Sequence, residues 1–403
     1  MGTAKASAMA MAMAMAIELE AWSEQAEELP AHVATALTHS GLLDVGADEP
    51  PSRWRLVTDS RVGVVTVGGY DVRVRPRLAI PRLMFLLGYA ADPRGWRELG
   101  PRFDVENDLF AAIAHGFAVH AERALSPAPV RGYVSVDDRT LTLRGRVRVG
   151  DQIARWPGLP IPLEVTYDDH VVDVPENQLV RGAAELLLRL PQLTTGVRRR
   201  LLRVRATLEE VEPAIPSASI SAPEITRLNE RYAGALKLAE LILRSTSIAT
   251  SRGKVTSVAF VFDMNKVFED FLAASLRMAL EWYGGSVQMQ YSRTHLDTER
   301  LLGLKPDITW WRAGGCRAII DAKYKALTNS SFPNADAYQM LAYCTAFGLD
   351  RGYLVYARDG KQELRDHTVH ETGTRIRVRA IDVEQEPADV LREVDALAAA
   401  IAA

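Results

Sequence analysis

Apolar and polar residues alternate in the first part of the chain, and further on they follow helical spacing. Residues 50–80 contain the run WRLVTDSRVGVVTVGGYDVRVRPRL, which alternates with a period of two around a Gly-Gly turn and therefore predicts β-strands. Residues 81–125 carry apolar side chains at helical spacing, and residues 130–244 mix strand and helix patterns. We expect a β-rich, a helical and a mixed segment, in that order.

The last third of the chain has a different order of predicted elements. FVFDMNKVFEDFLAASLRMAL predicts a strand end that runs into an amphipathic helix. The runs 308–311 and 317–320 flank Ala-Gly-Gly and predict a β-hairpin, because glycine takes the positive φ angles of tight turns. DAYQMLAYCTAFGL then predicts a helix, and residues 352–356 predict a strand. This order gives a mixed sheet flanked by helices, so we expect an α/β fold.

Two segments of distinctive composition divide the chain. The first 16 residues, MGTAKASAMAMAMAMA, are of low complexity, and we expect a disordered leader. The segment STSIATSRGK, residues 245–254, is polar and contains few large apolar side chains, so we place a domain boundary there. We therefore predict an amino-terminal region of mixed strands and helices over residues 17–250 and a carboxyl-terminal domain over residues 251–403.

Composition excludes several classes of protein. The chain is 48% hydrophobic and 25% charged, which is ordinary for a globular protein, and no run reaches the roughly 18 apolar residues of a membrane helix. The net charge of −3 excludes DNA binding through bulk positive charge. Two cysteines provide no disulfide framework and indicate the cytoplasm. Without a G-x-x-x-x-G-K-[ST] motif, we expect no nucleotide to bind this chain alone.

The ends of the predicted hairpin carry charged residues that suggest a reaction. With a three-residue loop centred on Gly314, Asp307 faces Asp321, at a Cβ separation of about 5 Å. Asp321 and Lys323 share one face of the strand. Paired carboxylates repel unless a cation lies between them, and their oxygens suit Mg²⁺ or Mn²⁺. The pattern predicts metal-assisted phosphodiester hydrolysis, with Lys323 positioning water or offsetting phosphate charge.

The two neighbouring helices offer further polar residues. Glu269 lies on the helix before the hairpin, where it could complete the metal shell. Gln339 and Tyr343 are four residues apart on the following helix and share one face, from which they could bond the lysine, a metal-bound water or a phosphate. The alternative is that these residues have only structural roles. Glu269 would then be an exposed helical side chain, Tyr343 would pack into the core, and the charged ends of the hairpin would lie on the surface.

Taken in order, these motifs resemble the PD-(D/E)xK nuclease superfamily. The motifs are Glu269, Pro306-Asp307, Asp321-Ala322-Lys323 and Gln339-x-x-x-Tyr343, the last of which resembles the RecB-like branch. FDMNKVFEDF, GLKPDITW, IIDAKYK and AYQMLAYC together look like the McrC family of McrBC modified-cytosine restriction systems. RPRLAIPRLMFLLGYA, LRGRVRV, YDDHVVDVPENQLVRGAAELLLRL and TRLNERYAGALKLAELILR extend the resemblance over residues 55–360. Asp321 stands where Glu is more usual, a permitted variant.

The resemblance implies a restriction-endonuclease-like domain in which Asp307, Asp321, the Ala322 carbonyl and Glu269 bind Mg²⁺ or Mn²⁺. It also implies double-stranded DNA as substrate and a hexameric McrB-like AAA+ GTPase as partner, whose GTP hydrolysis the amino-terminal region stimulates. The predicted function is the endonuclease subunit of a type IV restriction system in antiphage defence. Two alternatives stay open: a regulatory adaptor that activates the GTPase ring through charged residues between 130 and 180, and a stand-alone RecB-like exonuclease or repair nuclease.

Overall fold

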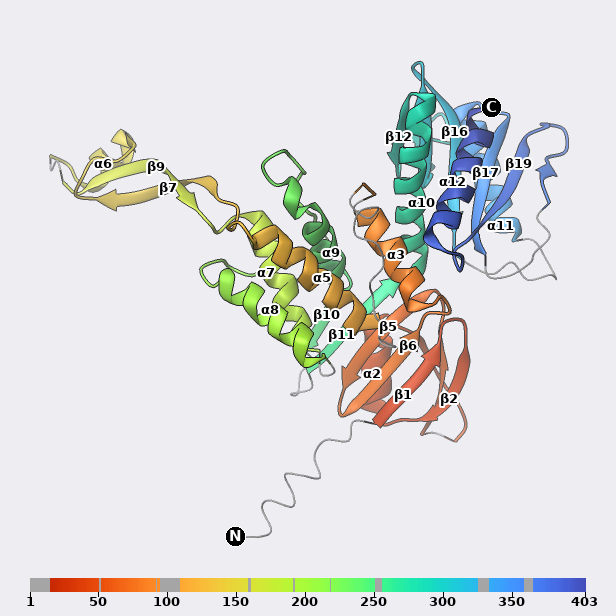
Figure 1. The fold of residues 1–403 in the computed structure, drawn as a ribbon, viewed down its shortest axis with the longest axis horizontal. Helices are drawn as coiled ribbons and strands as arrows, with labels where there is room; N and C mark the ends of the chain where they lie inside the picture. Colours follow the sequence, from red (N-terminus) through yellow and green to blue (C-terminus); the bar gives the residue numbers. More distant parts are fainter. Residues whose placement is uncertain are drawn as a thin grey trace, which may run out of the picture. The chain divides into compact units, whose positions relative to one another are not determined.

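The chain forms two compact units in a computed structural model (Figure 1). The structure describes residues 15–50, 52–91, 93–94, 109–158, 161–190, 193–217, 219–250, 256–324, 333–358 and 365–403. One unit joins the two ends of the sequence, Met1–Ala112 and Ser245–Ala403, and the other is Ile113–Arg244. Helices and sheets occur together, which confirms the predicted α/β class. The predicted single division at residue 250 differs from this grouping.

Strands from both ends of the sequence build a five-stranded sheet in the first unit. Its order is β1-β6-β5-β11-β10, with β11 antiparallel to β5. Gly63 of β5 permits this pairing, because a Cβ atom there would lie 2.1 Å from the carbonyl oxygen of Phe260 in β11. The strands are β1 (Met15–Glu20), β5 (Arg61–Val67), β6 (Tyr70–Arg75), β10 (Thr246–Thr250) and β11 (Thr256–Asp263).

Two segments that the sequence singles out by composition contribute strands to this sheet. Within residues 245–254, where the sequence places a domain boundary, Thr246–Thr250 forms the edge strand β10, antiparallel to β11. The segment lacks large apolar groups, yet its Thr and Ile residues are β-branched and favour a strand. Met15 and Ala16 belong to the predicted leader but begin strand β1, which pairs in parallel with β6. Residues 1–14 lie outside the described part of the chain.

A small sheet and two helices complete the amino-terminal part of this unit. The sheet has the order β2-β4-β3. Helix α3 packs against α10 (Met264–Leu280), where the rings of Phe85 and Tyr89 lie 5.4 and 5.7 Å from the ring of Phe271. These edge contacts connect the amino-terminal part with the carboxyl-terminal part. The elements are β2 (Glu24–Glu28), α2 (Ala31–Ser40), β3 (Asp44–Ala47), β4 (Arg53–Val57) and α3 (Ile80–Ala91).

A six-stranded mixed sheet forms the carboxyl-terminal part, in the order β12-β15-β16-β17-β19-β18. Strands β12, β15 and β16 are antiparallel, whereas β16, β17 and β19 run in parallel. Its elements and their neighbours are η2 (Glu281–Tyr283), β12 (Ser286–Met289), β13 (Thr294–His295), β14 (Gly303–Leu304), β15 (Ile308–Arg312), β16 (Gly315–Lys323), α11 (Asn334–Phe347), β17 (Arg351–Arg358), β18 (His367–Thr368), β19 (Arg375–Asp382) and α12 (Pro387–Ala402).

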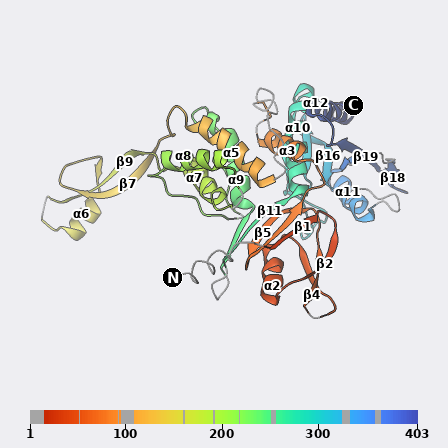
Figure 2. The ribbon, with the colours of Figure 1, turned by 60° about the horizontal axis from the view of Figure 1, so that its bottom comes forward.

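Helices α11 and α12 cover opposite faces of this sheet (Figure 2). Leu354 of β17 packs into the apolar cluster of α11, whereas the hydroxyl of the adjacent Tyr353 donates a hydrogen bond of 3.1 Å to a backbone carbonyl of α12. Ile319 of β16 belongs to the α11 cluster as well. Since successive strand residues alternate between faces, Asp321 and Lys323 lie on the α11 side.

The second unit combines helices with a small three-stranded sheet. Helices α8 and α9 pack against α7, which begins at Pro175, a residue favoured in the first turn of a helix. Helix α9 begins at Ala233, after a turn and the 3-10 helix η1. The elements are α5 (Leu109–Leu125), β7 (Gly132–Thr140), β8 (Arg146–Val147), α6 (Val149–Arg155), β9 (Leu163–Val171), α7 (Pro175–Leu187), α8 (Thr195–Thr207), η1 (Glu230–Tyr232) and α9 (Ala233–Arg244).

Strands β7 and β9 form a long antiparallel ribbon that carries α6 (Figure 1). Gly145, just before β8, has a φ of +69°, and a Cβ atom there would lie 2.3 Å from the carbonyl oxygen of Thr166. Because glycine has no Cβ atom, the backbone of β9 can approach this closely. The sheet order β7-β9-β8 places β9 in the centre of the ribbon.

Candidate functional site

The register of the β15–β16 hairpin brings the predicted acidic residues to one end. Ile308 is paired with Ile320, so the next positions outward are Asp307 and Asp321. This agrees with the pairing that the sequence predicts. Asp321 is the seventh residue of β16, and Asp307 directly precedes β15. The two side chains therefore come from adjacent antiparallel strands at the end away from the turn.

The turn of this hairpin differs from the predicted one. Arg312 pairs with Gly315, so the loop holds only two residues, Ala313 and Gly314, whose φ angles are 52° and 77°. Two successive positive φ angles are typical of a type I′ turn. A register shift between Trp310 and Trp311 then inserts one extra residue in β16. The predicted three-residue loop is wrong, and this bulge restores the expected register at the acidic end.

Asp321 is buried and has incomplete hydrogen bonding. Its side chain is 1% exposed, and the Nζ atom of Lys323 lies 2.6 Å from its Oδ2 atom. Apart from this ion pair, neither carboxylate oxygen of Asp321 has a hydrogen-bond partner among the described residues. Burial is the largest influence on its pKa and raises it, although Lys323 acts in the opposite direction. Such open oxygens in a buried carboxylate are suited to a cation.

Asp307 is the second acidic residue of the site. Its Oδ2 atom accepts a hydrogen bond of 3.0 Å from the backbone N–H of Ala322. Burial, followed by the negative charges of Asp321 and Glu269, raises the pKa of Asp307 to about 7. The hairpin register places the carboxylates of Asp307 and Asp321 at neighbouring positions, and their repulsion disfavours charge on both in the absence of a cation.

Helix α11 contributes a chain of hydrogen bonds to Lys323. The Nζ atom of Lys323 donates to Oε1 of Gln339 at 3.1 Å, and Nε2 of Gln339 donates to the hydroxyl of Tyr343 at 2.9 Å. The Tyr343 hydroxyl in turn donates to the backbone carbonyl of Lys305 at 3.1 Å. Burial and the charge of Asp321 raise the pKa of Tyr343 to about 12, so its hydroxyl remains a donor.

Glu269 approaches the site from α10. Its Oε1 atom accepts hydrogen bonds from Nζ of Lys266 at 3.0 Å and from Nε2 of Gln290 at 2.9 Å. The backbone N–H of Gln290 donates to the carbonyl of Asp307 at 2.8 Å. The sequence analysis does not identify Lys266 or Gln290. Lys266 has a local signal, its i to i+3 spacing from Glu269, whereas Gln290 reaches the site only through the fold.

The structure thus brings together the six predicted site residues. They are Glu269, Asp307, Asp321, Lys323, Gln339 and Tyr343. Within the described residues, however, no three His, Cys, Asp or Glu side chains are arranged as a ready metal-binding group. Glu269 is already occupied at one oxygen by a lysine and an amide. The donor set that best fits a divalent cation is therefore the Asp307–Asp321 pair, with the open oxygens of Asp321.

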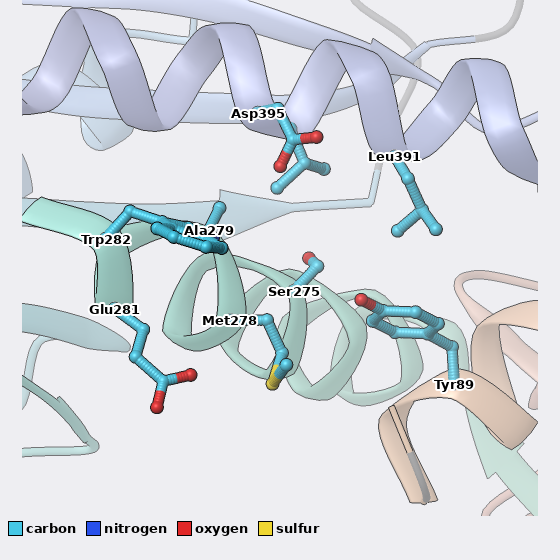
Figure 3. A pocket seen from close by; sticks show the side chains of 9 residues that line it. Tyr89, Ser275, Met278, Ala279, Glu281, Trp282, Leu391 and Asp395 are labelled. Atoms are coloured by element: carbon cyan, nitrogen blue, oxygen red, sulfur yellow. The ribbon is translucent and has the colours of Figure 1, made fainter. Parts of the chain in front are cut away.

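A separate pocket of about 590 Å³ lies at the carboxyl-terminal end of α10. Figure 3 shows Ser275 and Met278 of α10 on its floor, with Leu391 and Asp395 of α12 opposite them. None of the six site residues lines it. The pocket carries no pair of convergent acidic and basic groups, so the candidate chemistry belongs to the hairpin end.

The family model described as "McrBC 5-methylcytosine restriction system component" matches residues 56–357. The chain belongs to this family. The matched range covers more than half of the chain and contains all six site residues. Membership agrees with the resemblance that the motifs indicate. No match was found among curated proteins, and no helix in the described ranges is long and apolar enough to cross a membrane.

Solved structures provide a comparison for the fold. The family member resembles a chain of the refined half-complex from a tetradecameric assembly of Thermococcus gammatolerans McrB AAA+ hexamers with bound McrC. The TM-score is 0.54 at 16% identity, and the match covers 95% of this chain and 100% of that one. A chain of the Thermococcus gammatolerans McrBC complex gives a TM-score of 0.42 at 18% identity over 66% and 88% of the two chains. At such identities the first likeness shows a shared fold.

Proposed function

We propose that this family member is the metal-dependent DNA endonuclease subunit of an McrBC-type restriction system. The observation that supports it best is the buried Asp321, whose carboxylate oxygens lack hydrogen-bond donors while Asp307 and Lys323 lie beside it. A folded protein retains such an arrangement at the cost of stability, which favours a functional role. The mixed sheet, with α10 before the hairpin and α11 after it, is consistent with a PD-(D/E)xK domain.

Asp307 and Asp321 are the residues that would hold Mg²⁺ or Mn²⁺, with the Ala322 carbonyl and Glu269 as further oxygen donors. Such an ion, when bound, lowers the pKa of water and stabilises negative charge on a phosphate. The N–H of Ala322 points to Asp307, and in a paired strand the N–H and C=O of one residue point to the same edge. The Ala322 carbonyl is therefore available on the Asp307 side of β16.

Lys323 would supply positive charge next to the scissile phosphate. Burial lowers its pKa, but the ion pair with Asp321 and the negative charges of Asp307 and Asp336 have a larger combined effect, so the pKa lies above its usual value. The amine is therefore an ammonium at neutral pH. Asp321 and Gln339 fix its position, and its remaining proton can bond to water or to a phosphate oxygen.

We also propose that the ribbon β7–β9 with α6 binds a hexameric McrB-like AAA+ GTPase, and that the substrate is double-stranded DNA. Large apolar side chains on this ribbon are exposed, which favours a protein partner. The relevant residues, with their exposed fractions, are Tyr133 (76%), Leu141 (79%), Leu143 (63%), Val149 (62%) and Ile153 (65%). The same observation supports the second candidate function, an adaptor that activates the GTPase and for which DNA cleavage is secondary.

The test combines the purified chain, its McrB-like GTPase, GTP, Mg²⁺ and methylated DNA. We expect Lys323→Ala to reduce the cleavage rate by about 10² to 10⁴ while GTP turnover by the partner persists. Lys237→Ala, which removes an exposed lysine of α9, is the matched control and should cleave as the natural sequence does.

Other outcomes separate the alternatives. Stimulated GTP turnover with no Mg²⁺-dependent cleavage by the natural sequence would favour the adaptor function. Degradation of DNA ends by the chain alone, without partner or GTP, would instead support the stand-alone nuclease. Cleavage that survives Lys323→Ala would refute the proposed site.

A further inference from the structure

Three polar residues lie on one face of α11 and reach three different parts of the mixed sheet. Asp336, Gln339 and Tyr343 follow the spacing i, i+3 and i+7, which places them in line along the helix. Gln339 meets Lys323 of β16, and Tyr343 meets the backbone at Lys305, ahead of β15. Asp336, which the sequence analysis does not identify, meets a residue of β17.

The contact of Asp336 is with Tyr356. The hydroxyl of Tyr356 donates to Oδ2 of Asp336 at 2.6 Å, within the range of short, charge-assisted O–H···O⁻ bonds. Both residues are buried, with exposed fractions of 6% for Asp336 and 1% for Tyr356. Asp336 lies in the first turn of α11, where the helix dipole stabilises a carboxylate. The bond therefore attaches the beginning of α11 to the sheet.

Tyr356 is placed next to the candidate catalytic lysine. In the parallel pairing of β16 with β17, Lys323 is the register partner of Tyr356. Burial lowers the pKa of Lys323, but the negative charges of Asp321, Asp307 and Asp336 together outweigh it, so the pKa lies above its usual value. The carboxylate of Asp336 thus attracts the ammonium of Lys323 as well as bonding the strand next to it.

We propose that Asp336, bonded to Tyr356, is a positioning residue for Lys323. The bond fixes the first turn of α11 against β17, which sets Gln339 where it accepts the hydrogen bond from the lysine, and the carboxylate attracts the ammonium toward this face. The polar motif of α11 then comprises Asp336, Gln339 and Tyr343. The effect of this contact on catalysis rests on the proposed nuclease function. The placement of Lys323 itself can be measured without catalysis.

Two substitutions test the contact from its two sides. Tyr356→Phe removes only the hydroxyl, and Asp336→Asn keeps the shape of the side chain but removes its charge. Tyr353→Phe is the matched control, because it removes a buried hydroxyl from the same strand whose bond of 3.1 Å goes to α12 on the other face. A general loss of stability should affect all three variants, whereas loss of lysine positioning should affect only the first two.

The first measurement is the rate of reductive methylation of Lys323 in the folded, metal-free chain, followed by mass spectrometry. We expect methylation of Lys323 to be several-fold faster in Tyr356→Phe and Asp336→Asn than in the natural sequence, and unchanged in Tyr353→Phe. Rates equal to that of the natural sequence in the first two variants, or an equal increase in the control, would overturn the inference.

The second measurement is DNA cleavage by the complex with its GTPase partner. Loss of a group that orients a reacting residue typically reduces activity by about 10-fold to 100-fold. We expect this loss in kcat for Tyr356→Phe and Asp336→Asn, with KM for DNA unchanged, and full activity for Tyr353→Phe. If the natural sequence does not cleave but the methylation rates differ as expected, the proposed function fails while the positioning role stands. Unchanged kcat in an active complex would also overturn the inference.

Discussion

Two buried carboxylates, one in each unit, lie in opposite surroundings. Glu164 of β9 and Asp321 of β16 are both 1% exposed. Both oxygens of Glu164 accept hydrogen bonds, whereas those of Asp321 have none within the described residues and only one nearby ammonium, that of Lys323. The donors to Glu164, at distances between 3.0 and 3.2 Å, are Arg139, Arg148, Arg155 and Trp156.

The pKa values of the two carboxyl groups shift in opposite directions. Burial alone would raise the pKa of Glu164, but the bonds from Trp156 and Arg139 have a larger combined effect and hold it below its usual value. Burial raises the pKa of Asp321, and the attraction of the Lys323 ammonium does not offset it. A buried charge with all its partners stabilises a local fold, while one with open oxygens destabilises the fold unless a ligand completes it.

Glu164 is a buried carboxylate whose partners the fold supplies, whereas Asp321 is one that we propose to bind a metal ion, and the two are told apart by their hydrogen bonding alone. Through its ion pairs, Glu164 connects β9 with both ends of α6 and with the facing strand β7. These contacts give the exposed apolar ribbon a defined shape. Asp321 instead leaves coordination positions open beside Asp307. We therefore expect substitutions at the two positions to differ in kind, and the following measurements examine this difference.

The largest expected difference concerns metal binding and cleavage. Asp321→Asn should abolish the binding of Mn²⁺ to the chain, measured by calorimetry, because an amide is a far weaker ligand than a carboxylate. DNA cleavage by the complex should fall by at least about 10². Glu164→Gln should leave Mn²⁺ binding by the chain unchanged, since its donors already occupy both oxygens. Equal loss of Mn²⁺ binding in both variants would remove the distinction between the two carboxylates.

A smaller effect of opposite sign is expected for stability. In metal-free buffer, Asp321→Asn should raise the unfolding temperature by several degrees, because burial and the repulsion between Asp321 and Asp307 outweigh the attraction of Lys323, which keeps its bond to Gln339. Glu164→Gln should lower it by several degrees, because the arginines around it lose their negative partner. Thermal unfolding with EDTA measures both changes. Faster hydrogen exchange in β7 and β9, but not in β16, would locate the second effect, and destabilisation by Asp321→Asn would contradict the first.

The sequence predicts much of this site because its parts are close in the chain or follow regular spacing. The pairing of Asp307 with Asp321 and the helical face of Gln339 and Tyr343 follow from local geometry alone. The two-residue turn does not, because the bulge that compensates for it leaves no recognisable residue pattern. The predicted pairing of Asp307 with Asp321 is therefore correct although the predicted loop is wrong, because the bulge compensates for the shorter loop.

Long-range pairing explains most of what the sequence does not reveal. Strands β10 and β11 join a sheet whose other strands, β1, β5 and β6, all lie before residue 76, and no local pattern encodes this pairing. Glu164 stands inside the apolar run LEVTY, so only the fold shows its four donors. Asp336 lies three residues before Gln339, yet its role depends on Tyr356 from the next strand. Apart from Lys266, which contacts Glu269 on the same helix, the residues that the sequence does not reveal are those whose partners come from distant segments.

The smallest expected effect is the pH dependence of metal-free stability, and it depends on Asp307. Burial and its acidic neighbours raise the pKa of Asp307 from 3.8 to about 7 in the folded chain. Between these values the folded chain holds a proton that the unfolded chain releases, so the free energy of unfolding falls as pH rises, by at most about 1.4 kcal/mol per pH unit. Denaturant unfolding in EDTA between pH 5 and 8 measures this slope.

Two variants test whether Asp307 causes this pH dependence of the free energy of unfolding. Asp307→Asn should flatten it, whereas Glu164→Gln should leave it unchanged, because the pKa of Glu164 lies below its usual value and its contribution is lost only as the pH falls through the acid range. Mg²⁺ competes with the proton on Asp307, so it should raise the unfolding temperature more at pH 8 than at pH 6. If the slope persists in Asp307→Asn, or if Mg²⁺ stabilises equally at both pH values, then Asp307 is not the group through which protons and metal compete.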